Sequence, residues 1–213
     1  MCSKPKKTED IKELCKETAQ KLFNIATSEK LIFPIYSSGE IRISEQEARV
    51  LFCKTIECNS DYFYSVETPT KHKYKFSFIN AKKKKEYCEE VDQGQSALID
   101  LSLYKKNEDN FEQLYNIEFK ANNVGKHNIH KDFIKLGHEE GTGVFFHILK
   151  NVNSGTLPSV LSKYKEYSSK TTKPIIFVVV ILEAKKVYWL ETCVNKIKKL
   201  PDMSTWEMIL SSK

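Results

Sequence analysis

The stretch YNIEFKANN, residues 115–123, alternates apolar and polar side chains in the manner of a β-strand. One face would carry the apolar set, which is Tyr115, Ile117, Phe119 and Ala121. The other face would carry Glu118 and Lys120 between asparagines. A solvent-exposed edge strand shows the same alternation, so the pattern indicates a functional site only if another segment supplies a partner for Glu118.

The expected partner of Glu118 is Asp100, which lies in the middle of a second strand-like stretch, SALIDLSLY, residues 96–104. Aspartate is depleted in strands and is seldom buried without something bound to it, so Asp100 is anomalous among its apolar neighbours. If the two stretches pair with their apolar faces together, both carboxylates fall on one side of the sheet. Two converging carboxylates repel each other unless a cation that prefers oxygen ligands, such as Mg²⁺, lies between them.

Lys120 has a role in either interpretation of this pair. Beside a metal ion, its ammonium would orient a metal-bound water or stabilise the charge that builds on a scissile phosphate. In the structural alternative, Asp100 and Lys120 form a cross-strand ion pair and Glu118 faces solvent.

The other hydrophobic patterns predict a mixed α/β fold. The expected helices cover residues 8–30, 45–58, 129–140 and 157–169, and the expected strands cover residues 61–70, 73–79, 96–104, 113–121, 143–149, 173–182 and 186–191. A Pro-containing turn would join the first two strands, and a loose antiparallel hairpin would join the next two. Strands alternate with helices after residue 121, which favours parallel strands in that half.

These residues and this element order resemble the PD-(D/E)xK nuclease superfamily, in which an aspartate in one strand precedes an E-x-K in the next. The resemblance covers residues 44–150, although Leu98 and Ile99 stand where many members have proline. It implies a restriction-endonuclease-like mixed β-sheet flanked by helices, with an αβββαβ core. The domains that follow are a helical extension (1–43), a nuclease-like domain (44–192) and a C-terminal tail packed on it (193–213).

The resemblance also implies roles for individual residues. Asp100, Glu118 and the main-chain carbonyl of Phe119 would hold Mg²⁺ or Mn²⁺, and Lys120 would orient the attacking water. Some members add a glutamate from the first core helix, and we favour Glu45 as this catalytic residue. Ser44 and Glu47 have capping-box spacing, which already accounts for Glu47. A favourable charge at a helix N-terminus would also explain Glu45.

Two groups of lysines are candidates for contacts with nucleic-acid phosphates. Lys131 and Lys135 lie one helical turn apart, opposite the apolar side of their expected helix, although a solvated face is the commoner reason for such a pair. The dense basic run consists of Lys82, Lys83, Lys84 and Lys85. It would either follow a nucleic-acid backbone or serve only to keep a loop soluble.

Composition limits the partners only weakly. A formal net charge of +6 favours a polyanion mildly, and because Arg42 and Arg49 are the only arginines, the chain is poorly equipped to read guanine with planar guanidinium groups. The six cysteines include no C-x-x-C pair, the N-terminus has no apolar leader, and no apolar run is long enough to span a bilayer. These features predict a cytoplasmic protein with no membrane partner.

The sequence therefore predicts a metal-dependent endonuclease that hydrolyses DNA phosphodiester bonds, with restriction, defence and repair as the roles left open. A homodimer would supply the two active sites that cutting both strands of a duplex usually requires. Two alternatives remain. The chain would be a non-catalytic module on the same fold that binds nucleic acid or protein, or an unrelated α/β protein whose E-x-K is accidental.

Overall fold

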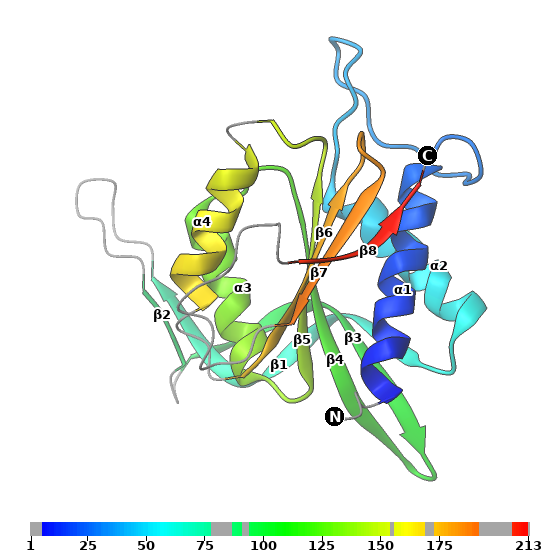
Figure 1. Ribbon diagram of the computed structural model, residues 1–213. Helices are drawn as coiled ribbons and strands as arrows, with labels where there is room; N and C mark the ends of the chain where they lie inside the picture. The colour runs from blue at the N-terminus through cyan, green and yellow to red at the C-terminus, as the bar shows by residue number, and fades with distance from the viewer. Residues whose placement is uncertain are drawn as a thin grey trace.

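The chain folds around one mixed β-sheet with helices on both faces (Figure 1). The computed structural model describes residues 6–77, 87–90, 94–153, 156–168, 173–191 and 206–212. The helices are α1 (Lys6–Phe23), α2 (Glu45–Asn59), α3 (Lys126–His138) and α4 (Thr156–Ser168). The strands are β1 (Phe63–Ser77), β2 (Tyr87–Glu90), β3 (Gln95–Asn107), β4 (Asn110–Ala121), β5 (Thr142–Leu149), β6 (Ile175–Ile181), β7 (Lys186–Glu191) and β8 (Glu207–Ser211).

The sheet order within the described residues is β2-β1-β3-β4-β5-β6-β7-β8. Strands β4, β5 and β6 are parallel, and the other neighbouring pairs are antiparallel. The prediction of parallel strands in the second half is thus confirmed. β6 is a run of apolar residues that is buried throughout, as expected of a parallel strand covered on both faces.

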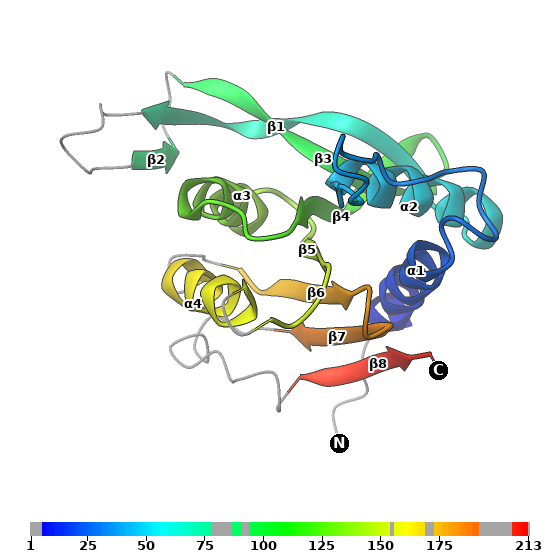
Figure 2. The same ribbon diagram turned by 90° about the horizontal axis from the view of Figure 1, so that it is seen from above.

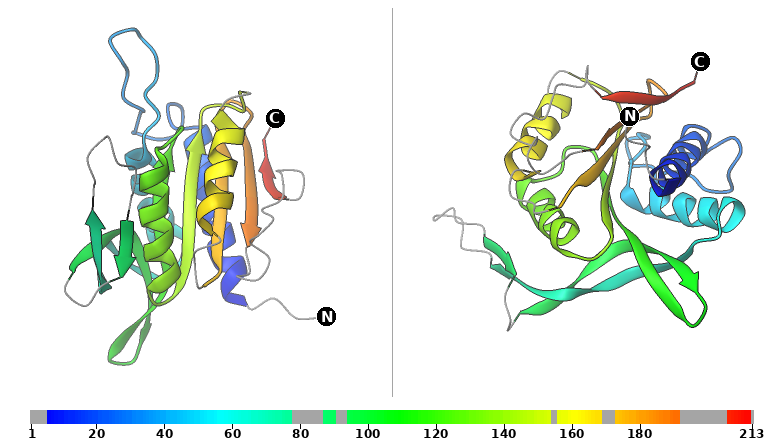
Figure 3. Two further views of the ribbon diagram at one scale, coloured as in Figure 1. Left: turned by 90° about the vertical axis from the view of Figure 1, so that its left-hand side faces the viewer. Right: turned by 60° about the horizontal axis from the view of Figure 1, so that its bottom comes forward.

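Helices lie on both sides of the sheet (Figures 2 and 3), and the two larger hydrophobic clusters of the described residues lie between the helices and the two faces. Helices α1 and α2 cover one face, where Phe52 meets Phe119 and Phe146 edge to face. Helices α3 and α4 cover the other face, where Phe133 packs against Phe145. Helix α1 ends at Phe23 rather than near residue 30, and it shares the first core with α2 and the sheet.

The predicted turn between residues 70 and 73 is wrong, because β1 is one continuous strand with a bulge. Its pairing with β3 shifts register between Pro69 and Lys73. The N–H groups of Lys71 and His72 donate to the carboxylate of Glu139 at the end of α3, at 2.8 and 3.1 Å. Proline interrupts the ladder but not the strand, since Glu139 satisfies the freed backbone donors.

Other boundaries also differ from the prediction. The connection between β3 and β4 is a tight turn at Glu108 and Asp109, because the ladder extends to Asn107↔Asn110. The C-terminal tail contributes β8, which pairs with β7. No helix among the described residues is long and apolar enough to span a membrane.

The end of β4 is fixed by a chain of hydrogen bonds that runs from Asn122 into the core. Asn122 has left-handed backbone conformation (φ 59°), and its N–H donates to the Ile148 carbonyl at 2.8 Å. Its own carbonyl lies 2.6 Å from His147 Nε2, while His147 Nδ1 lies 2.5 Å from the Tyr164 hydroxyl. Both ring nitrogens therefore have partners, so His147 is a satisfied core histidine.

Burial lowers the pKa of His147 to about 4, so the native ring stays neutral. Its ordinary pKa is about 6.5, and between these values the unfolded chain takes up a proton that the native state does not. We therefore expect the contribution of His147 to be complete above pH 6.5 and to fall by about 2–3 kcal/mol as the pH drops to 4. Urea unfolding across this range should give a flatter pH profile for His147→Gln than for the natural protein. Parallel profiles would contradict the assignment.

Candidate active site

Strands β3 and β4 part where their carboxylates lie. The register pairs run back from the turn to Leu101↔Ile117 and stop before Asp100 and Glu118 would face each other. Instead of a ladder partner, the Phe119 N–H has the Asp100 carboxylate, whose Oδ2 accepts its hydrogen bond at 2.8 Å. The expected convergence of Asp100 and Glu118 on one side of the sheet is thus present, at a point where the two backbones diverge.

Glu118 is buried, with only 1% of its surface exposed. Its Oε1 lies 2.5 Å from Lys135 Nζ, and its Oε2 lies 3.8 Å from Lys120 Nζ. The structural alternative, in which Glu118 faces solvent, is therefore wrong. The strand alternation placed Glu118 and Lys120 correctly on the face opposite the apolar set, and that face is covered by α3.

Helix α3 completes the site with two residues of opposite charge. Lys135 Nζ contacts three oxygens, because it also lies 3.1 Å from Asp132 Oδ1 and donates to the Leu98 carbonyl at 2.7 Å. Its 6% exposure shows that it does not lie on a solvated face. Lys131, the other lysine considered for phosphate contact, is half-buried on the same helix.

Lys135 is buried, and not solvated as a polar helix face usually is, because the sheet curves around α3. Helix α3 contacts β1, β2 and β4 as well as β5 and β6, so its polar side faces strands rather than water (Figure 2). Helical periodicity does not show that this polar side packs against strands, and Asp132 was not among the predicted site residues. The available signal was the i, i+3 spacing of Asp132 and Lys135, which places opposite charges side by side.

Lys120 bridges β4 and α3. Its Nζ lies 2.9 Å from Asp132 Oδ2 and donates to the carbonyl of Phe119 at 2.9 Å. The contact with Asp132 is an ion pair without good hydrogen-bond geometry, so Asp132 Oδ2 is buried with no hydrogen-bond partner among the described residues. Asp132 Oδ2 is thus engaged by the charge of the Lys120 ammonium.

Glu45 lies at the first position of α2, half-buried and close enough to interact electrostatically with Lys120, Asp100 and Asp132. Burial raises its pKa, with Lys120 opposing the shift. The side chain of Ser44 caps α2 by accepting from the N–H of Gln46 at 3.2 Å. The capping box does not account for Glu47, whose Oε2 is buried without a hydrogen-bond partner in the described part of the chain.

The charges in this cluster shift one another's pKa values. Burial lowers the pKa of Lys120 and of Lys135, but neighbouring carboxylates more than offset it, so both lysines have raised pKa values and remain ammonium ions. Burial raises the pKa of Asp132, but the two lysines outweigh it and lower the net value. Burial and the Asp132 charge raise the pKa of Glu118 well above its ordinary range.

The metal ligands that the resemblance implies lie close together, but lysine ammonium groups already contact two of them. Glu118 Oε1 is held by Lys135, and the Phe119 carbonyl is held by Lys120. Among the described residues, no group of three His, Cys, Asp or Glu side chains is arranged to hold a metal ion. A cation could therefore bind only if at least one ammonium moved away. Lys82, Lys83, Lys84 and Lys85 lie outside the described residues.

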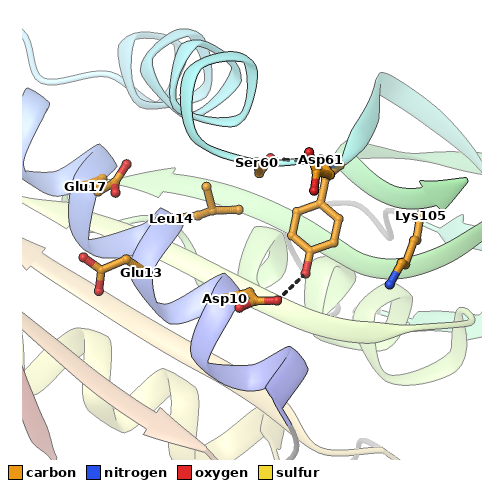
Figure 4. Close-up of a pocket in the computed structure, with 8 residues that line it drawn as sticks. Asp10, Glu13, Leu14, Glu17, Ser60, Asp61 and Lys105 are labelled. Carbon is orange, nitrogen blue, oxygen red and sulfur yellow. Dashed lines mark hydrogen bonds between the residues drawn. The ribbon is translucent and has the colours of Figure 1, made fainter.

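A separate pocket of about 380 Å³ lies between α1 and the start of β1 (Figure 4). Its lining includes four carboxylates and one lysine: Asp10, Glu13, Glu17, Asp61 and Lys105. Tyr62 also lines the pocket, and its hydroxyl donates to Asp10 at 3.2 Å. This acidic lining would repel a polyanion, so the pocket does not suit a nucleic-acid backbone.

Comparisons with protein-family models, with curated proteins and with solved structures returned no match for this chain. A function can therefore be inferred only from the residues and their geometry.

Removal of Lys135 should expose the cost of burying Glu118 and Asp132. We expect Lys135→Met to lower the free energy of unfolding by about 3–5 kcal/mol, because it leaves two buried carboxylates with one ammonium. The matched control is Lys126→Met on the same helix, since the Lys126–Glu166 ion pair has side chains 57% and 43% exposed. Such surface pairs contribute about 0–1 kcal/mol. Urea unfolding of both variants checks this, and equal small effects would contradict the buried-cluster description.

Proposed function

We propose that this chain is a metal-dependent phosphodiesterase of the PD-(D/E)xK type that hydrolyses DNA. The observation that carries the proposal is the assembly of Asp100, Glu118 and Lys120 where β3 and β4 part. A chance E-x-K in a strand would not require a buried glutamate beside an aspartate and two lysines. Such a cluster is costly to bury, which favours a chemical role.

The order of elements agrees with this assignment. Helix α2, strands β1, β3 and β4, helix α3 and strand β5 follow one another as αβββαβ, with the short strand β2 inserted between β1 and β3. We therefore assign the restriction-endonuclease-like fold as part of the proposal. In that fold Asp100, Glu118 and Lys120 would be the defining residues.

Lys120 would act as a cation and not as a proton acceptor. Its raised pKa keeps it protonated at neutral pH, so it can donate hydrogen bonds to the attacking water or to a phosphate oxygen. As an ammonium held by Asp132, it would stabilise negative charge that develops on the phosphate. Asp132 would be a positioning residue that fixes the Lys120 side chain.

The donor set suits a hard divalent cation. Asp100, Glu118, Asp132 and Glu45 supply four carboxylates against the two ammonium groups of the cluster, which leaves a formal charge of −2 when all are ionised. Asp100, Glu118 and the Phe119 carbonyl would hold Mg²⁺ or Mn²⁺. When bound, the ion would supply Lewis-acid polarisation of the phosphate and a water of lowered pKa.

A second candidate is a non-catalytic module on the same fold that binds nucleic acid or protein. One observation favours it: Lys135 already contacts Glu118, Asp132 and the Leu98 carbonyl, as a resident cation would. If Lys135 never leaves, no metal enters and the site is inert. Divalent ions would then leave the thermal stability unchanged, since only a ligand of the folded state raises it.

The nuclease proposal predicts cleavage of DNA with Mg²⁺ or Mn²⁺ that is abolished by EDTA. Lys120→Ala should lower the single-turnover rate by about 10²–10³-fold, the usual effect of deleting one preorganised charge that stabilises a transition state. Lys165→Ala, a change at an exposed lysine of α4, serves as the control and should cleave normally. Plasmid and single-stranded DNA should both be tested, because the site geometry does not distinguish them.

Two results would count against the proposal. Cleavage that Lys120→Ala retains would indicate a contaminating nuclease. A protein that cuts neither DNA and gains no stability from Mn²⁺ would support the binding-module candidate instead.

A further inference from the structure

A hairpin of apolar residues projects from the molecule between α1 and α2. Residues 34–42 close on themselves through three backbone hydrogen bonds: Tyr36 N–H to Glu40 at 2.8 Å, Gly39 N–H to Tyr36 at 2.9 Å, and Arg42 N–H to Pro34 at 2.7 Å. The turn has Gly39 in left-handed conformation, with φ 86°. The segment is thus an ordered hairpin, which Figures 1 and 3 show rising beyond the ends of β5 and β6.

The hairpin exposes the side chains that a protein usually buries. Ile35 is 63% exposed, Tyr36 53% and Ile41 54%. The flanking residues Phe33 and Ile43 are instead buried in the core beneath α1 and α2. A firmly rooted hairpin therefore presents exposed apolar side chains on its two arms, next to a polar turn at residues 37–40. Apolar patches of this kind on protein surfaces mark interaction sites.

The base of the hairpin is tied to the candidate active site. Asn122 Nδ2 donates to the Ile43 carbonyl at 3.0 Å, and Asn122 follows Lys120 by two positions. The hairpin then continues through Ser44 into Glu45 at the start of α2. Because His147 and Ile148 hold the Asn122 backbone, the hairpin has a fixed position relative to Lys120.

We propose that the apolar arms of this hairpin, formed by Ile35, Tyr36 and Ile41, contact unpaired bases of the DNA strand cut at the Asp100–Glu118–Lys120 site. The inference rests on the proposed function and extends it to a substrate class, which is single-stranded or locally opened DNA. Tyrosine provides a ring on which any base stacks, and isoleucine is among the side chains that wedge between bases. Arg42, exposed at the open end of the hairpin, adds a positive charge for the backbone, opposed by Glu40 in the turn.

Continuity with the cleavage site favours a nucleic-acid occupant over a second copy of the chain. A strand whose phosphate lies at Lys120 would have its neighbouring nucleotides near the hairpin, because Asn122 joins the two directly. The acidic pocket beside α1 lies away from this path and would not compete for the strand.

Binding should be measured in EDTA with a labelled single strand, a forked duplex and a fully paired duplex, using fluorescence anisotropy. Tyr36→Ala and Ile35→Ser should bind the single strand and the fork about tenfold more weakly, the effect expected from losing one stacked base. Binding of the fully paired duplex should change little. Met208→Ala, at a residue of β8 that is 52% exposed, is the matched control and should bind all three DNAs normally.

Each alternative result has a definite meaning. Hairpin variants that bind normally, while Lys120-dependent cleavage persists, would overturn this inference and leave the nuclease proposal standing. Hairpin-dependent binding without any metal-dependent cleavage would support the inference and remove the nuclease proposal. If the variants instead convert a dimer to a monomer in sedimentation and bind DNA normally, the apolar arms form a contact between copies and the inference is wrong.

Discussion

The buried ion cluster between β4 and α3 is the constraint on which the site depends. Glu118, Asp132, Lys120 and Lys135 are each about one-tenth exposed or less, and a buried charge without a partner costs several kcal/mol. Each of these residues is therefore tolerable only because the others are present. The cluster requires α3 to lie against β4, and the aromatic contact between Phe133 and β5 holds it there.

The other contacts around the site follow from the packing of α3 against β4. Strands β3 and β4 separate, and the Asp100 carboxylate accepts a hydrogen bond from the backbone of β4. The first turn of α2 places Glu45 close enough to interact electrostatically with Asp100 and Lys120. Beyond Lys120, the hydrogen bonds of Asn122 link β4 to β5 and to the hairpin before α2. Three elements distant in sequence thus meet at one end of the parallel strands.

Patterns within short stretches of sequence correctly predicted the features that depend on neighbouring residues. The alternation in residues 115–123 placed Glu118 on the correct face, and an aspartate among apolar residues identified Asp100 before any contact was known. The position of Lys135 could not be predicted in this way. Periodicity shows which side of a helix is apolar, but whether its polar side meets water or a curved sheet depends on contacts with strands far away in sequence. Pro69 led to the wrong prediction of a turn for the same reason. The backbone N–H groups freed at its bulge donate to Glu139, which is distant in sequence.

The proposed binding of a divalent cation at this cluster can be tested with a crystal of the protein soaked in Mn²⁺, using anomalous diffraction to locate the ion. The account predicts an anomalous peak between the carboxylates of Asp100 and Glu118, with the Lys135 ammonium displaced from Glu118 Oε1. A crystal saturated with Mn²⁺ that shows no peak there, with the ion pair between Lys135 and Glu118 intact, would contradict it.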